Sequence, residues 1–383
     1  MGASLLSATV LFVALPLCMG RPPRLLVGTH HKTGTVLMKE MLDILAKPEL
    51  MNLTVKHNKV PREGDDIEGH VPGSVHIIPY DPIDVSAMAK AEWKEIDVLF
   101  DHRVHWREDE MEIMRTKGGG KRKLKFVHLV RHPLDMIASG YVYHKQDPPP
   151  SYEPWLSEPL SELLRTPKPW VLEVKSIAGE DHWQGAESYS HLLRRLPLKI
   201  GALAEALRSK EDVEEMITAL HLEGLHVCLD SFGEDFNATT ERILKYWLLS
   251  KKERKENKEI ENLQELKDAV WPLAHPPRSQ HINPGTLEDR AYIQNEVAHY
   301  TFMEPLLRSF QLFAPEPCKD REWPLDPNWK GTRHYNPETD EVDEDPYIVP
   351  PPSGYDDDDP PTFTHNKPNN DLEKKMTDML DEL

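Results

Sequence analysis

The sequence predicts an α/β protein in which a parallel β-sheet is covered by helices on both faces. Short apolar runs that can form buried strands occur at residues 25–27, 97–100, 126–130 and 226–229. Segments with helical periodicity lie between these runs. Strands that alternate with helices predict a parallel sheet between two helical layers, and ligands of such sheets bind beyond the carboxyl ends of the strands.

The first strand runs into a turn with the features of an anion-binding loop. Residues 25–27 are followed by a polar turn that contains Gly34, and an apolar-periodic helix extends from Val36 to Leu45. The first turn of a helix has unpaired N–H groups and a partial positive charge, and Lys32 adds a full charge beside them. Two hydroxyl donors flank the glycine, at Thr33 and Thr35. We therefore expect this loop to bind an anion.

A second strand-to-helix junction follows residues 126–130. Arg131 stands at the carboxyl end of this strand, and its planar guanidinium matches phosphate oxygens bidentately. Pro133 suits the first position of a helix, and Asp135 suits the first turn. Ser139 lies one helical turn beyond Asp135, so the two share a face. This junction predicts a second phosphate contact.

The two junctions together resemble a known enzyme family. In the first loop, Lys32-Thr-Gly-Thr places the lysine before the glycine, whereas the usual nucleotide P-loop places it after the second glycine. This order resembles the 5′-phosphosulfate loop of sulfotransferases that use 3′-phosphoadenosine-5′-phosphosulfate (PAPS). The segment from Arg131 to Tyr141 resembles their 3′-phosphate signature, Arg-x-Pro-x-Asp-x-x-x-Ser-x-Tyr. The resemblance spans residues 24–314 and implies a P-loop nucleotide-kinase-like sulfotransferase fold.

The resemblance also implies the reaction and the residues that serve it. The sulfuryl group of PAPS would move in line to a hydroxyl or amine of a carbohydrate, protein or small-molecule acceptor, without a metal. Lys32 would be catalytic, because it would stabilise charge that grows on the leaving phosphate. The predicted cofactor-binding residues are His31, Lys32, Thr33, Gly34, Thr35 and Val36 in the first loop, Arg131 and Ser139 at the second junction, and Arg278 and Gly285 in a later turn.

His102 is the predicted general base. It follows the strand candidate at residues 97–100, where cytosolic sulfotransferases carry a histidine, although their Lys-Thr-His is here Phe100-Asp101-His102. An imidazole with an ordinary pKa near ~6.5 suits a general base at neutral pH. Several Golgi sulfotransferases use an earlier glutamate instead, so Glu68 stays an alternative, as do His70 and His105. No metal-ligand spacing is evident among the histidines.

The rest of the chain is expected to be helical or loop-rich. Residues 52–91 are expected to be mainly loop, residues 117–125 a basic exposed loop, and residues 147–170 a long loop that could gate the substrate. Further helices are predicted at residues 188–207, 211–220, 239–249 and 287–304.

The N-terminus predicts entry into the secretory pathway. Residues 3–20 carry no charge, and residues 1–20 are interpreted as a signal peptide cleaved after Gly20. An uncleaved signal anchor that fixes the protein to a membrane through residues 3–20 is the alternative. Asn52 and Asn237 stand in glycosylation sequons, and Cys228 and Cys318 are either a disulfide pair or buried thiols. With PAPS as donor, these features place the protein in the Golgi lumen, with secretion as the alternative.

Charge separates the domain from an acidic tail. The chain of 383 residues has a formal net charge of −19, and residues 330–383 contain 15 acidic against five basic side chains. Residues 324–383 are rich in proline and aspartate, which predicts disorder. The acidic balance argues against a nucleic-acid partner.

Two other functional classes stay open at this stage. A P-loop phosphotransferase, such as a kinase, uses the same type of sheet, although the Lys-before-Gly order argues against it. A lumenal protein that binds a nucleotide without catalysis is the other alternative. The sequence does not identify the sulfate acceptor.

Overall fold

The computed structural model describes most of the predicted domain. The described residues are 22–58, 75–78, 96–117, 123–149, 153–165, 168–274, 287–320, 334–336 and 341–343. By its internal contacts the chain divides into a first unit, residues 1–331, and a second unit, residues 332–383.

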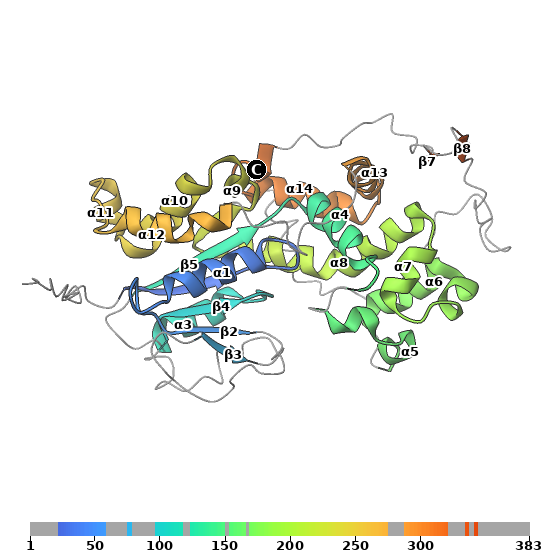
Figure 1. The fold of residues 1–383 in the computed structure, drawn as a ribbon, viewed down its shortest axis with the longest axis horizontal. Coiled ribbons are helices and arrows are strands. Elements are labelled where there is room, and N and C mark those ends of the chain that lie inside the picture. Colours follow the sequence, from blue (N-terminus) through green and yellow to red (C-terminus); the bar gives the residue numbers. More distant parts are fainter. Residues whose placement is uncertain are drawn as a thin grey trace, which may run out of the picture. The chain divides into compact units, whose positions relative to one another are not determined.

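The first unit is built on a parallel sheet, which confirms the predicted α/β class (Figure 1). Six strands lie in the order β3-β2-β4-β1-β5-β6, and each described pairing between neighbours is parallel. Their bounds are Arg24–Gly28 (β1), Val55–Asn58 (β2), Val75–Ile78 (β3), Val98–Asp101 (β4), Leu124–Val130 (β5) and Leu225–Cys228 (β6). β1 therefore lies between β4 and β5, which brings the three predicted site strands together.

One face of the sheet is covered by α1 (Thr35–Leu45), α10 (Phe236–Leu248) and α12 (Leu263–Val270) (Figure 1). Alternate strand residues such as Leu25 and Val27 pack with these helices, and Trp247 of α10 is 1 % exposed. The indole Nε1 of Trp247 donates a hydrogen bond to the carbonyl of Pro23 at 2.8 Å. This burial anchors β1 and thereby the loop that follows it.

The other face packs against α3 (Glu108–Lys117) and the end of α8 (Leu198–Leu220). Leu26, Leu99 and Phe126 point into this layer, on the opposite side from their strand neighbours, as the two-residue period of a strand requires.

A separate helical layer packs around α4 (Pro133–His144). Its other members are α6 (Pro169–Gln184), α7 (Tyr189–Arg195), α13 (Leu287–Ala298) and α14 (Met303–Phe313), together with α8. The remaining short elements of the first unit are η1 (Pro154–Ser157), α5 (Leu160–Leu163), α9 (Asp230–Glu234), α11 (Lys251–Lys255), η2 (Trp271–Ala274) and η3 (Cys318–Asp320).

The predicted strands are confirmed within one or two residues, whereas several helix boundaries differ. The helix expected at residues 188–207 is broken between α7 and α8, because Pro197 forces Leu196 into an extended conformation with ψ 142°. α8 then continues through residues 208–210, where a break was expected. α10 starts at Phe236 rather than at residue 239, because the carboxylate of Asp235 accepts a hydrogen bond from the amide of Ala238 at 2.9 Å.

Two regions expected as loops contain regular structure. Residues 52–91 include β2 and β3, and residues 147–170 include η1 and α5. α13 ends at Ala298, and α14 begins after a short turn. In the second unit, β7 (His334–Asn336) pairs antiparallel with β8 (Glu341–Asp343), and the rest of the predicted disordered tail lies outside the described residues.

Cys228 and Cys318 form a disulfide that joins the end of β6 to η3, with their Cα atoms 5.6 Å apart. This resolves the two alternatives for the cysteines in favour of the bond. Among the helices that the structure describes, none has the length and apolar character needed to cross a bilayer. The predicted signal segment, residues 1–20, lies outside the described part of the chain.

Candidate functional site

The two predicted phosphate-binding junctions lie side by side at the carboxyl edge of the sheet. β1 pairs with β5 in parallel register, with Gly28 opposite His128, and each strand leads into a helix that starts beyond this edge. α1 begins at Thr35 and α4 at Pro133. The expected positions of Pro133 and Asp135 in the first turn of α4 are confirmed.

The loop between β1 and α1 is held in one shape by its own hydrogen bonds. The His30 carbonyl accepts from the Thr33 amide at 3.1 Å, from the Thr33 hydroxyl at 2.9 Å and from the Thr35 hydroxyl at 3.2 Å. Gly34 has φ 97°, and a Cβ there would lie 2.7 Å from Leu229, so this position favours glycine. Thr33 is fully buried. Its hydroxyl accepts a hydrogen bond from the His30 amide at 2.7 Å, so Thr33 also shapes the loop.

Arg131 links the two junctions. It follows β5, and its Nη1 donates a hydrogen bond to the carbonyl of Lys32 at 3.3 Å. Ser139 lies on α4 and is 6 % exposed, while Asp135 on the same face accepts a hydrogen bond from Gln294 at 2.6 Å. Val36, in the first turn of α1, is exposed. The loop of Lys32 and the predicted 3′-phosphate arginine are thus in direct contact.

The side chain of Lys32 is held by an aromatic ring and a carboxylate. Its Nζ lies 2.9 Å from the ring centroid of Tyr143 and 3.6 Å from Oε1 of Glu153, and the side chain is 15 % exposed. Burial, assisted by the positive charge of Arg208, lowers the pKa of Lys32 to about 7, although Glu153 opposes this shift. Lys32 therefore titrates close to neutral pH.

A buried charged cluster surrounds this lysine, which we call the Glu153 cluster: His31, His144, Glu153, Glu205 and Arg208. His144 Nδ1 lies 2.8 Å from Glu205 Oε2, and His144 Nε2 lies 3.3 Å from Glu153 Oε2. The His31 and His144 rings stack, with centroids 4.9 Å apart and an interplanar angle of 23°. Arg208 lies 3.9 Å from Glu205 and 3.0 Å from Asp212.

Burial and neighbouring charges shift the pKa values of Glu153 and His31. Burial alone would raise the pKa of Glu153, but His31, His144 and Lys32 hold it well below its ordinary value. Burial lowers the pKa of His31 well below its ordinary value, against the opposing charge of Glu153. Sequence reasoning included His31 only as a loop residue and missed Glu153, His144, Glu205 and Arg208, which come from segments with no shared motif.

A chain of three histidines runs beneath the loop. His30 Nε2 lies 3.1 Å from His128 Nε2, and His128 Nδ1 lies 3.2 Å from His226 Nδ1. His226 Nε2 lies 3.0 Å from the carbonyl of Leu222 and must donate to it. A neutral imidazole carries one N–H, so His226 Nδ1 accepts a hydrogen bond from His128 Nδ1. His128 Nε2 then has no hydrogen and accepts one from His30 Nε2. All three rings are neutral in this arrangement.

His102 lies beyond the carboxyl end of β4, the other neighbour of β1, and is half-buried. Next to it, the guanidinium of Arg103 lies 2.9 Å from Glu211 and 3.3 Å from Glu215 on α8. His105 Nδ1 lies 3.2 Å from the Arg103 carbonyl. The remaining sequence candidates, Glu68, His70, Arg278 and Gly285, lie outside the described residues.

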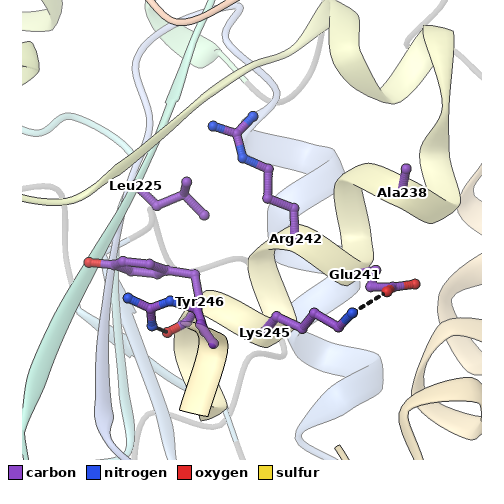
Figure 2. A pocket seen from close by; sticks show the side chains of 7 residues that line it. Leu225, Ala238, Glu241, Arg242, Lys245 and Tyr246 are labelled. Carbon is purple, nitrogen blue, oxygen red and sulfur yellow. Dashed lines mark hydrogen bonds and ion pairs between the residues drawn. The ribbon is translucent and has the colours of Figure 1, made fainter. Parts of the chain in front are cut away.

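A pocket beside α10 is a different feature (Figure 2). Leu225, the first residue of β6, and side chains of α10 and α11 line it. Lys245 is paired with Glu241 at 2.7 Å, and Arg254 donates to the Tyr246 carbonyl at 3.1 Å. The lining of this pocket includes none of Lys32, His102 and Arg131.

Searches of protein-family models, of curated proteins and of solved structures found no match to this chain. The assignment of a function therefore depends on the residues and their geometry.

Proposed function

We propose that the protein is a PAPS-dependent sulfotransferase with the P-loop-like sulfotransferase fold. The observation that carries the proposal is the hydrogen bond from Arg131 to the carbonyl of Lys32 at 3.3 Å. This bond joins the β1–α1 loop, proposed to bind the 5′-phosphosulfate, to Arg131, proposed to bind the 3′-phosphate. Both lie at the carboxyl edge of a parallel sheet, where ligands of such sheets bind. This contact supports the proposal that the two sequence motifs form one site.

The 3′-phosphate distinguishes PAPS from ATP, and Arg131 and Ser139 are the residues proposed to bind it. Arg131 offers a planar set of donors at the tip of β5, and Ser139 offers a hydroxyl two turns into α4. The α1 N-terminus supplies amides and a partial positive charge for the 5′-phosphosulfate.

Lys32 is the proposed catalytic cation. An acceptor oxygen or nitrogen forms a bond to sulfur while the bond from sulfur to the 5′-phosphate oxygen breaks, and its electron pair stays on that oxygen. A protonated Lys32 stabilises this charge. Because its pKa is about 7 in the ligand-free protein, an anionic donor beside Nζ favours the charged form needed for this role.

His102 stays the proposed base that accepts the acceptor proton. It lies beyond β4 at the same edge of the sheet as Lys32. Glu153 is nearer to Lys32, but a carboxylate whose pKa is held well below its ordinary value is a weak base. We therefore propose that Glu153 is a charge partner of Lys32.

The proposed compartment is the secretory pathway, with the Golgi lumen as the place where PAPS is used. The disulfide between Cys228 and Cys318 supports an oxidising compartment. Asn52, in one of the sequons, is exposed. The acceptor is a carbohydrate, protein or small molecule.

Calorimetry with two nucleotides tests the proposal. Adenosine 3′,5′-bisphosphate, the desulfated product, should bind at least tenfold more tightly than AMP, which lacks the 3′-phosphate. Arg131→Ala should remove this preference, whereas Arg308→Ala on the exposed face of α14 should keep it. Equal affinity for both nucleotides in the unmodified protein would contradict the proposal, and tight Mg²⁺-dependent binding of ATP would favour a phosphotransferase.

A further inference from the structure

Three side chains of the Glu153 cluster have the composition and spacing of a metal site. His31, His144 and Glu153 each offer one ligand atom, and these three atoms lie within 4.8 Å of one another. Two imidazole nitrogens and one carboxylate are a common ligand set for zinc. The residues come from the β1–α1 loop, the end of α4 and the segment before η1, so sequence spacing did not reveal them.

Two of the distances between the ligand atoms are close to those of tetrahedral coordination. Zinc bonds of about 2.0–2.1 Å place neighbouring tetrahedral ligands about 3.3 Å apart. His144 Nε2 lies 3.3 Å from Glu153 Oε2, and His31 Nδ1 lies 3.6 Å from Glu153 Oε1. These two contacts involve different oxygens of the Glu153 carboxylate, so Glu153 must rotate, or bind through both oxygens, to share one ion with both histidines.

The carboxylate of Glu205 orients His144 for metal coordination. His144 Nδ1 lies 2.8 Å from Glu205 Oε2, so a metal-bound His144 would carry its hydrogen on Nδ1 and coordinate through Nε2. A carboxylate behind a histidine ligand fixes the tautomer and raises the basicity of the ring, as in many zinc sites. Glu205 is itself held by Ser209 at 3.1 Å and Tyr189 at 3.4 Å, and it is fully buried.

The proposed ligand nitrogen of His144 also lacks a hydrogen bond. Nε2 of His144 is buried and makes no hydrogen bond within the described part of the chain. A buried polar atom without a hydrogen bond is unfavourable, and a bound cation would remove this penalty.

We propose that His31, His144 and Glu153 bind one divalent transition-metal ion of the zinc type, with Glu205 as the outer carboxylate that orients His144. Three protein ligands leave a fourth position for water or another ligand. Lys32 competes with the ion, because its Nζ lies 3.6 Å from Glu153 Oε1. Metal binding therefore removes the ion-pair partner of Lys32.

The proposed metal site shares His31 with the predicted 5′-phosphosulfate loop but contains neither Arg131 nor Ser139. The preference for a 3′-phosphate and metal binding can therefore fail separately. A hard cation such as Mg²⁺ prefers oxygen ligands and is not expected at two imidazoles.

Zinc titration calorimetry on the untagged, chelator-treated full chain tests the proposal. We expect one equivalent of Zn²⁺ with micromolar or tighter affinity, and no comparable binding of Mg²⁺. His144→Ala and Glu153→Gln should each weaken zinc binding by more than roughly 100-fold, since even outer partners are typically worth 10–100-fold. His299→Ala, which removes an exposed histidine of the turn after α13, should leave zinc affinity unchanged. Lys32→Met should increase zinc affinity, because it removes the competing ammonium group.

The controls separate loss of a ligand from loss of the fold. Circular dichroism without zinc identifies variants that do not fold, and Glu153→Gln keeps the size of a side chain that is 15 % exposed. The proposal is overturned by absence of zinc binding to the unmodified chain. Equal zinc affinity in Glu153→Gln, His299→Ala and the unmodified chain would overturn it as well, whatever the outcome of nucleotide binding.

Discussion

The three-histidine chain beneath the β1–α1 loop predicts a measurable dependence of stability on pH. Burial, with contributions from His30 and His226, holds the pKa of His128 well below its ordinary value. His128 is fully buried in β5, so it stays neutral in the folded protein at mildly acidic pH. In the unfolded chain the same imidazole is exposed and accepts a proton below about pH 6.5. The contribution of neutral His128 to the free energy of unfolding is therefore fully present above about pH 6.5. It is lost progressively as the pH falls below that value.

The magnitude follows from the two protonation equilibria. Between about pH 7 and about pH 5, protonation of one ordinary imidazole stabilises the unfolded state by about 2 kcal/mol. A His128→Leu variant lacks this contribution, but it leaves His30 and His226 without their shared partner. That loss should lower the free energy of unfolding at pH 7 by about 1–3 kcal/mol. Between about pH 7 and about pH 5, the free energy of unfolding of the variant should therefore fall by about 2 kcal/mol less than that of the unmodified protein.

Denaturant unfolding of both proteins at the two pH values measures this difference. Other groups whose pKa is shifted, including Glu215 with a pKa raised to about 7, titrate in both proteins and cancel in the comparison. His299→Ala should behave like the unmodified protein. An identical pH dependence in the unmodified protein and His128→Leu would refute the assignment of His128 as a neutral, buried link of the chain.

Three further predictions concern the site and the disulfide. Lys32→Ala should reduce turnover by about 10²-fold or more while weakening cofactor affinity less. An equal fold-loss in turnover and in cofactor affinity would contradict a transition-state role. His102→Ala should keep cofactor affinity and remove the limb of the rate profile that rises as an imidazole deprotonates; an unchanged profile would direct the search to Glu68, His70 and His105. Cys228→Ala should lower the free energy of unfolding by about 2–5 kcal/mol in denaturant titrations under oxidising conditions, because the bond closes a loop with a sequence separation of 90; no effect would contradict the bond.

The parts of the fold that local sequence determines were predictable. An apolar run followed by a glycine turn and a periodic helix identified β1 and α1, and Pro133 with Asp135 identified the start of α4. These signals depend on residues within one helical turn of each other. The break before α8 was missed, although Pro197 was a readable signal for it.

The parts that depend on the order of the strands were not predictable from one sequence. His128 and His226 belong to strands identified by their apolar neighbours, and only the parallel register of β5 and β6 places them opposite each other. The Glu153 cluster likewise unites a loop, two helices and the segment before η1. Glu153 lay within a region interpreted as a loop, where neither periodicity nor a motif signals contact with Lys32.

Transfer of a labelled sulfuryl group is the direct test of the proposed reaction. The full chain is incubated with PAPS carrying radioactive sulfur and with panels of carbohydrates, proteins and small molecules, and the labelled product is counted. We expect label to move to at least one acceptor without added metal, and we expect Arg131→Ala and Lys32→Ala each to abolish most of the transfer. Absence of transfer to every acceptor class, together with equal binding of adenosine 3′,5′-bisphosphate and AMP, would contradict the proposed reaction.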